Sequence, residues 1–219
     1  MNLIEYADRD MLFLDLANRL AGELETALLH AERVSFAVPG GTTPGPMFDE
    51  LCAADIAWDR VDVLLTDERR VPADHERSNE RLIRERLITS RAKAAQFVRL
   101  VPEEADAGPE IQRLSSLLPI DVMVLGMGSD MHTASLFPGS LDLPAAMDRH
   151  APPLMAVAAS EGLEPRVTLT GPVLSQAISV HVLITGDEKK AVLEKARAAN
   201  HLEAPIGIVL GQADIHWAP

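Results

Sequence analysis

The chain has 219 residues, of which 47% are hydrophobic and 24% are charged, and its formal net charge is −13. That charge argues against nucleic acids and anionic membranes as partners, because both bind positively charged protein surfaces. The sequence lacks the run of ~18 apolar residues that a membrane span requires, and charged residues interrupt the N-terminal region where a signal peptide would be apolar. A single cysteine excludes a disulfide framework and suits a reducing compartment. We therefore expect a cytoplasmic protein, and a monomer, since nothing in the sequence demands assembly.

The hydrophobic pattern predicts helices and strands that alternate along the chain. Leucines at every fourth position from Leu12 to Leu28 predict an amphipathic helix over residues 10–30. Short β-branched runs predict buried strands, and helical spacing recurs between them. After the first helix we predict, in chain order, a strand over 34–38, a helix over 44–53, a strand over 61–66, a helix over 78–88 with Ser78 as its N-cap, a weaker strand over 97–100, a helix over 111–118, a strand over 120–125, a weaker strand over 154–158, a helix over 172–177, a strand over 180–185, a helix over 188–199 and a strand over 206–210.

Strands that are apolar throughout and separated by helices are typical of a mostly parallel sheet with helices on both faces. The predicted fold class is therefore α/β, a three-layer α/β/α arrangement, and we expect one domain over residues 1–219. Proline and glycine are frequent between Leu136 and Pro153, which predicts a long ordered loop, or a lid, rather than a linker between domains.

Polar residues follow several predicted strands directly, at the edge where parallel sheets bind ligands. The first group is Pro39–Pro44, with Gly40 and Gly41 followed by two threonines. Glycines let a backbone approach a ligand closely, and a following helix N-terminus favours an anion, so this segment is a candidate phosphate loop. The alternative is an ordinary glycine turn in which Thr43 caps the helix.

The second group is the charged segment from Asp67 to Arg70, followed shortly by Arg77. Such a run is either a solvated loop or a site for a hydroxylated, anionic substrate.

The third group contains Asp130 and His132 two residues apart after a predicted strand. Histidine suits a general base that activates water, and a carboxylate can orient it. A structural histidine is the alternative.

The positive charge that an anionic ligand needs could come, in this acidic chain, from Arg166 and from Lys189 or Lys190. Both lysines also fit the exposed surface of a helix. Ser135 lacks the G-x-S-x-G context of a serine nucleophile, and Cys52 fits a buried thiol better than a nucleophile. Scattered histidines and the absence of C-x-x-C and H-E-x-x-H predict no metal site.

Six motifs occur together in one order and resemble the 6-phosphogluconolactonase family, which shares its fold with glucosamine-6-phosphate isomerase. They are Gly40-Gly41-Thr42-Thr43-Pro44, Thr66-Asp67-Glu68-Arg69, Arg77-Ser78-Asn79, the segment Gly126–Gly139 with Asp130 and His132-Thr-Ala-Ser-Leu-Phe-Pro, Arg166–Thr170, and Gly186–Lys189. The resemblance covers nearly the whole chain and implies a modified doubly wound, Rossmann-like sheet. It also implies hydrolysis of 6-phosphogluconolactone to 6-phosphogluconate, without a metal or organic cofactor.

The resemblance implies a role for each matching residue. His132 matches the catalytic base, with Asp130 orienting it. The phosphate-binding positions match Gly40, Gly41, Thr42, Arg166 and Lys189, and Asp67 and Arg77 match substrate-binding positions. Met131 departs from the family, which has glycine there, and a left-handed backbone at that position would cost about 1–2 kcal/mol. The alternatives are a glucosamine-6-phosphate isomerase, disfavoured by the residues after His132, and a sugar-phosphate-binding protein without catalysis.

Overall fold

The computed structural model describes residues 2–100, 108–158 and 164–219. Its centre is a seven-stranded sheet in which every neighbouring pair is parallel, in the order β1-β10-β9-β6-β2-β3-β5. This confirms the predicted α/β class with a mostly parallel sheet. The strands are β1 (Asn2–Glu5), β2 (Val34–Val38), β3 (Val61–Leu65), β5 (Gln96–Val98), β6 (Val122–Gly126), β9 (Ser179–Thr185) and β10 (Asp214–Ala218).

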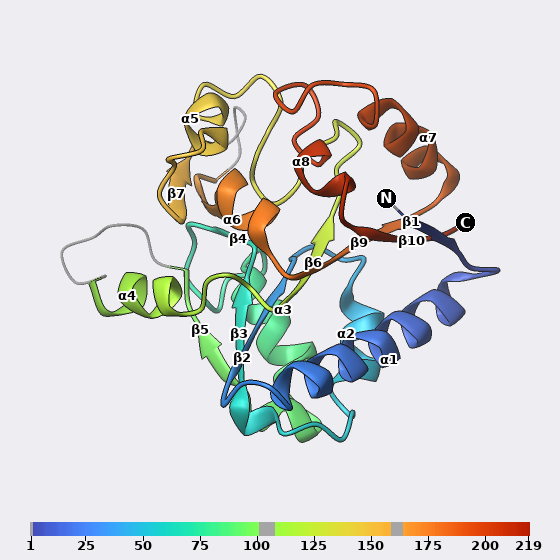
Figure 1. Cartoon of the computed structure of the whole chain (residues 1–219), viewed down its shortest axis with the longest axis vertical. Helices are drawn as coiled ribbons and strands as arrows, with labels where there is room; N and C mark the ends of the chain where they lie inside the picture. The colour runs from blue at the N-terminus through green and yellow to red at the C-terminus, as the bar shows by residue number, and fades with distance from the viewer. Residues whose placement is uncertain (1, 101–107, 159–163) are drawn as a thin grey trace.

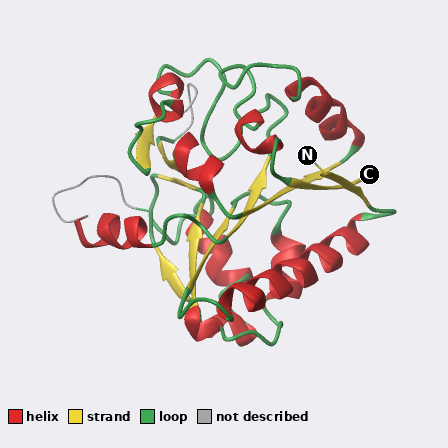
Figure 2. Cartoon of the chain, viewed as in Figure 1, coloured by secondary structure: helices red, strands yellow, loops and turns green. Residues whose placement is uncertain are grey.

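Helices cover both faces of this sheet, as Figures 1 and 2 show, with α1 and α2 on one side and α6, α7 and α8 on the other. The helices are α1 (Arg9–Leu28), α2 (Gly45–Leu51), α3 (Asn79–Arg86), α4 (Gly108–Ser116), α5 (Leu143–Met147), α6 (Gly171–Gln176), α7 (Asp187–Ala196) and α8 (Gly207–Leu210). Two short 3-10 turns, Trp58–Arg60 and Ser90–Ala94, lie between strands.

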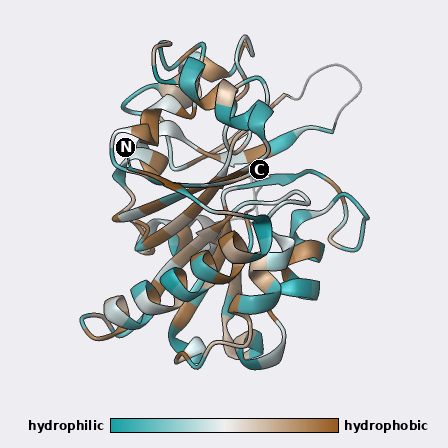
Figure 3. Ribbon diagram, turned by 90° about the vertical axis from the view of Figure 1, so that its right-hand side faces the viewer, coloured by the Kyte–Doolittle hydropathy of each residue, from teal (hydrophilic) through white to brown (hydrophobic). Residues whose placement is uncertain are grey.

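The leucine stripe of α1 packs on the sheet as its spacing predicts. Leu12, Leu16, Leu20 and Leu24 are fully buried, and each contributes roughly 1.5–3 kcal/mol on burial. The helix begins where Asp8 accepts a hydrogen bond from the backbone N–H of Met11 at 2.8 Å. Figure 3 shows hydrophobic residues concentrated along the central strands, with hydrophilic residues on the surrounding helices and loops. The core therefore lies on both faces of the sheet.

A second, antiparallel sheet of three strands, in the order β4-β8-β7, was not predicted as a sheet, although the weaker strand predicted over 154–158 is its β7. Its strands are β4 (Asp67–Arg69), β8 (Arg166–Leu169) and β7 (Leu154–Val157). Asp67 pairs with Thr168, and Leu154 pairs with Leu169. Because only Thr66 separates the end of the central strand β3 from the start of β4, this small sheet stands directly at the carboxyl edge of the main one.

Two sequence predictions were wrong in detail. The predicted strand over 206–210 is the short helix α8, entered after Pro205, and the strand at that end of the chain is β10 instead. The pattern of β10 escaped notice because His216 interrupts it, yet that side chain is buried and hydrogen-bonded to Tyr6 and His181. The expected long loop over 136–153 contains the helix α5. Ser78 is the N-cap of α3, as predicted.

Candidate active site

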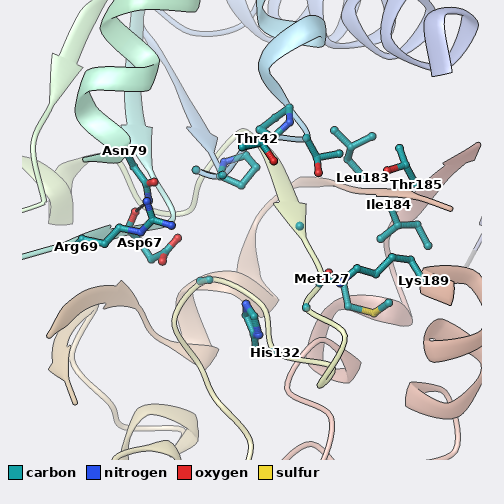
Figure 4. A pocket seen from close by; sticks show the side chains of 18 of the residues that line it. Thr42, Asp67, Arg69, Asn79, Met127, His132, Leu183, Ile184, Thr185 and Lys189 are labelled. Atoms are coloured by element: carbon teal, nitrogen blue, oxygen red, sulfur yellow. Dashed lines mark hydrogen bonds between the residues drawn. The ribbon is translucent and has the colours of Figure 1, made fainter. Parts of the chain in front are cut away.

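The carboxyl ends of four central strands surround a cleft of about 220 Å³. The registers place Val38 beside Leu65 and Gly126 beside Leu183, so the loops that follow these strands meet at one edge. Figure 4 shows the side chains that line the cleft. The lining is formed by residues 39–44, Asp67, Arg69, Asn79, residues 126–128, His132, Ala134, Arg166, residues 183–185 and Lys189. Most of the predicted site residues therefore come together here.

The candidate phosphate loop forms one wall of this cleft. It follows β2, and Gly40, Gly41 and Thr42 all line the cleft. A Cβ on Gly40 would lie 1.9 Å from the Oδ1 atom of Asn79, and Gly41 has a φ of +83°. Both positions therefore require glycine, and the backbone reaches into the cleft without side chains in front of it.

His132 lines the cleft and forms a pair with Asp130, which is not among the lining residues. The Nδ1 atom of His132 lies 2.5 Å from Asp130 Oδ1, and the ring packs against Phe137 with 4.8 Å between centroids. Burial of Asp130 opposes its ionisation, but the adjacent His132 outweighs this effect and lowers the pKa of the carboxyl. Since Nδ1 is held by the carboxylate, Nε2 is the ring nitrogen left for a ligand.

The turn that carries this pair has little room. Gly128 donates its N–H to the carbonyl of His132 at 2.9 Å, and a Cβ on Gly128 would lie 2.1 Å from His132 Nδ1. Met131 has a φ of +70°, so it adopts the left-handed conformation that costs a side chain about 1–2 kcal/mol. Its side chain packs against the hydrophobic core, and its carbonyl accepts the N–H of Ile206 at 3.2 Å. The turn therefore accommodates methionine at position 131 while His132 and Asp130 stay within hydrogen-bond distance of each other.

Charged side chains from the small sheet form another wall of the cleft. Asp67 accepts a hydrogen bond from Ser135 Oγ at 2.6 Å and lies 3.8 Å from Arg166 Nη1. The Nε atoms of Arg166 and Arg69 are buried and have no hydrogen-bond partner in the described part of the protein. Burial and the charge of Arg69 lower the pKa of Arg166. Crowded, partly unsatisfied guanidinium groups of this kind favour an anionic ligand.

The two candidate lysines separate clearly. Lys189 lines the cleft, and its Nζ donates to the carbonyl of Met127 at 2.9 Å, which leaves donors for a ligand. Lys190 lies 3.9 Å from the centre of the Trp217 ring and forms an ion pair with Glu5 at 2.8 Å. Lys189 is therefore the one placed to meet a bound anion.

The predicted residue Arg77 is not part of the cleft lining, and its guanidinium pairs with Glu164 at 3.1 Å. Two residues from the same motifs line the cleft instead. Arg69 stands two positions after Asp67 in β4, so both side chains lie on one face of that strand. Asn79 donates from Nδ2 to the carbonyl of Asp67 at 2.9 Å. In a strand, alternate side chains lie on the same face, and this alternation would have placed Arg69 beside Asp67. The sequence does not show it, because β4 consists of three charged residues and has no alternation of polar and apolar ones.

The cleft is positively charged although the chain is strongly acidic. Of the described residues that line it, Arg69, Arg166 and Lys189 are basic and Asp67 alone is acidic. The net charge of −13 therefore does not disfavour an anionic ligand at this site. Among the described residues, no three histidine, cysteine, aspartate or glutamate side chains are grouped so that they could hold a metal ion. Within the same residues, no helix is long and apolar enough to cross a membrane.

Known proteins of one family match nearly the whole chain. The sequence model of the family described as Glucosamine-6-phosphate isomerases/6-phosphogluconolactonase matches residues 7–217. The 6-phosphogluconolactonase of Mesorhizobium japonicum is 39% identical, with 98% of this chain and 94% of that protein covered. That of Rhizobium meliloti is 40% identical, with 93% of each chain covered. The crystal structure of a 6-phosphogluconolactonase from Shewanella baltica superposes with a TM-score of 0.93 at 33% identity, over 100% of this chain and 98% of that one. The protein therefore belongs to the family of glucosamine-6-phosphate isomerases and 6-phosphogluconolactonases.

Proposed function

We propose that the protein hydrolyses 6-phosphogluconolactone to 6-phosphogluconate in the pentose phosphate pathway, with His132 as general base. The observation that carries the proposal is the His132–Asp130 pair, 2.5 Å apart, whose histidine lines a cleft with three basic side chains. Relatives named 6-phosphogluconolactonase, at 39% and 40% identity, support this substrate.

The substrate phosphate is bound by the loop at Gly40–Thr42 together with Arg166 and Lys189. The glycine backbone admits a phosphate at close range, and the two cations supply the charge that an anion requires. Arg69 contributes to the same positive wall. Asp67 carries the only carboxylate among the described lining residues, and it accepts a hydroxyl of the sugar ring.

The reaction breaks the ester bond of the lactone ring. Nε2 of His132 takes a proton from water, and the resulting hydroxide attacks the ring carbonyl carbon. The tetrahedral intermediate collapses as the bond to the ring oxygen breaks, and His132 returns the proton to that oxygen. Asp130 holds the ring through Nδ1 and stabilises its protonated form. The tetrahedral intermediate carries a negatively charged oxygen that needs hydrogen-bond donors. The N–H of Gly128 is not one of them, because it donates to the carbonyl of His132 within the turn.

The proposal is tested by generating the lactone in place with glucose-6-phosphate dehydrogenase and following acid release against the spontaneous rate. We expect hydrolysis well above that rate, and no ammonia from glucosamine 6-phosphate. Ammonia release without lactone hydrolysis would assign the isomerase reaction instead. Saturable binding of 6-phosphogluconate without turnover would show that the protein binds the sugar phosphate but does not catalyse its hydrolysis. The left-handed turn at Met131 would then be the first position to examine for the cause.

A further inference from the structure

The hydroxyl of Ser135 is buried beside the cleft without lining it. Ser135 follows His132 by three residues and is 1% exposed. Its Oγ donates to Asp67 Oδ2 at 2.6 Å, and its backbone N–H donates to Thr168 Oγ1 at 3.1 Å. Because its proton is held by a carboxylate and its oxygen is shielded from the cleft, Ser135 is not placed to attack a ligand. The interaction that its hydroxyl makes is the hydrogen bond to the Asp67 carboxylate.

The two carboxylate oxygens of Asp67 have different surroundings. Oδ2 receives the Ser135 hydroxyl and faces Arg166, whereas Oδ1 lies 3.5 Å from Thr66 Oγ1, at the outer limit of a hydrogen bond. Asp67 lines the cleft, yet its side chain is only 10% exposed. Oδ1 therefore keeps acceptor capacity that bulk water does not fully satisfy, and a ligand hydroxyl can use it.

The same hydrogen bond connects two walls of the cleft. The segment that carries His132 is held at the end of β6, where Thr133 Oγ1 donates to the carbonyl of Gly126 at 2.9 Å, and a backbone bridge joins Thr133 to Leu136. Ser135 then fastens this segment to Asp67 in β4. Figure 4 shows Asp67 beside Arg69 and Asn79, on a different wall from His132. The Ser135 hydroxyl is thus the bond that ties this segment to the Asp67 carboxylate itself, beside the bond from the Ser135 N–H to Thr168, the residue that pairs with Asp67 in the small sheet.

We propose that Ser135 is a positioning residue, whose hydroxyl fixes Oδ2 of Asp67 so that Oδ1 accepts a hydroxyl of the bound sugar phosphate. Ser135 acts only through Asp67 and does not touch the ligand. The inference rests on the proposed function, because it takes the ligand to be a hydroxylated sugar phosphate. It adds the residue that fixes the orientation of the hydroxyl-recognising carboxylate.

The test is Ser135→Ala in the lactone assay. A hydrogen bond to a charged group is lost, so we expect KM to rise roughly 10- to 100-fold. We expect kcat to change less, because Asp67 binds ground state and transition state alike. In an Asp67→Ala background the same substitution should have little further effect, because that background already lacks the carboxylate that accepts the Ser135 hydroxyl. The matched control is Ser35→Ala, which removes a buried serine hydroxyl that donates to Asp121 Oδ2 at 2.8 Å. Because Ser35 is not in the cleft, KM should stay at the wild-type value.

A second measurement separates this inference from the proposed function. If the wild-type protein does not hydrolyse the lactone, the proposed function fails, and the dissociation constant of 6-phosphogluconate is compared between wild type and Ser135→Ala instead. Tenfold weaker binding by the variant supports the positioning role. An unchanged KM or dissociation constant overturns it, as does an undiminished effect in the Asp67→Ala background. If the alanine variant does not fold, Ser135→Cys, nearly isosteric and a weak donor, gives the same comparison.

Discussion

Replacing Gly128 by alanine should inactivate the site without unfolding the protein. A Cβ at this position would lie 2.1 Å from His132 Nδ1, 2.2 Å from His132 Cε1 and 2.4 Å from Asp130 Oδ1. Carbon atoms make ordinary contact at about 3.5–4.0 Å, so the imidazole and the carboxylate must retreat by more than about 1 Å. The backbone of Gly128 is not in the left-handed region, so alanine is excluded by this contact and not by its own conformation.

A displacement of about 1 Å of a catalytic group can cost 10²-fold in rate, so we expect kcat for the lactone to fall by about 100-fold, or about 2.7 kcal/mol. The assay is acid release at saturating lactone, with a urea unfolding curve to show that the variant is folded. The control is Gly126→Ala, at the last residue of β6 and two positions before Gly128, where an added Cβ meets no atom within 4 Å. The Gly126 variant should retain the larger part of kcat. A Gly128→Ala variant with the wild-type kcat would refute the account of His132 and its turn.

The remaining predictions concern charge, helix stability and pH. Lys189→Ala should raise KM for the lactone by roughly 10-fold or more in steady-state kinetics, whereas Lys190→Ala should leave KM unchanged, because only Lys189 lines the cleft. Gly22→Ala should stabilise α1 by roughly 0.5–1 kcal/mol in urea unfolding, because an added Cβ meets nothing within 4 Å, and a loss of stability would contradict this. Burial and the neighbouring His181 lower the pKa of His216 from 6.5 to about 4. The unfolded chain therefore takes up this proton first on acidification, and the free energy of unfolding should drop by about 2 kcal/mol between pH 7 and pH 5. His216→Gln should lose this part of the pH dependence, and an unchanged slope would show that other groups cause it.

The interior strands β2, β3, β6 and β9 were predictable because each is buried on both faces. Val34–Val38 and Val61–Leu65 are apolar or β-branched nearly throughout, which marks them as interior strands of a parallel sheet. The strands β4 and β7 of the small antiparallel sheet are not buried throughout in this way. Asp67–Arg69 is a strand of three charged residues, held by pairing with a segment far along the chain. Such pairing depends on tertiary contacts, so the local sequence could not reveal it.

The candidate site was predictable in its motifs but not in every side chain. Glycines and polar residues directly after the strands indicated that Gly40, Asp67 and His132 would meet, because the ends of parallel strands share an edge. The choice between Arg69 and Arg77 required the pleat of β4, which sets the direction of each side chain. The φ of Met131 likewise depends on the whole turn and not on its neighbours in sequence.

The central claim is that His132 is the general base of a lactone hydrolysis, and the most direct test compares wild type, His132→Ala and the uncatalysed reaction. His150→Ala is the matched control, because His150 is exposed and bonded to Arg149 outside the cleft. General base catalysis contributes typically 10²–10⁴-fold, so the His132 variant should lose a factor in that range while the His150 variant retains the wild-type rate. Full hydrolysis by the His132→Ala protein would contradict the account.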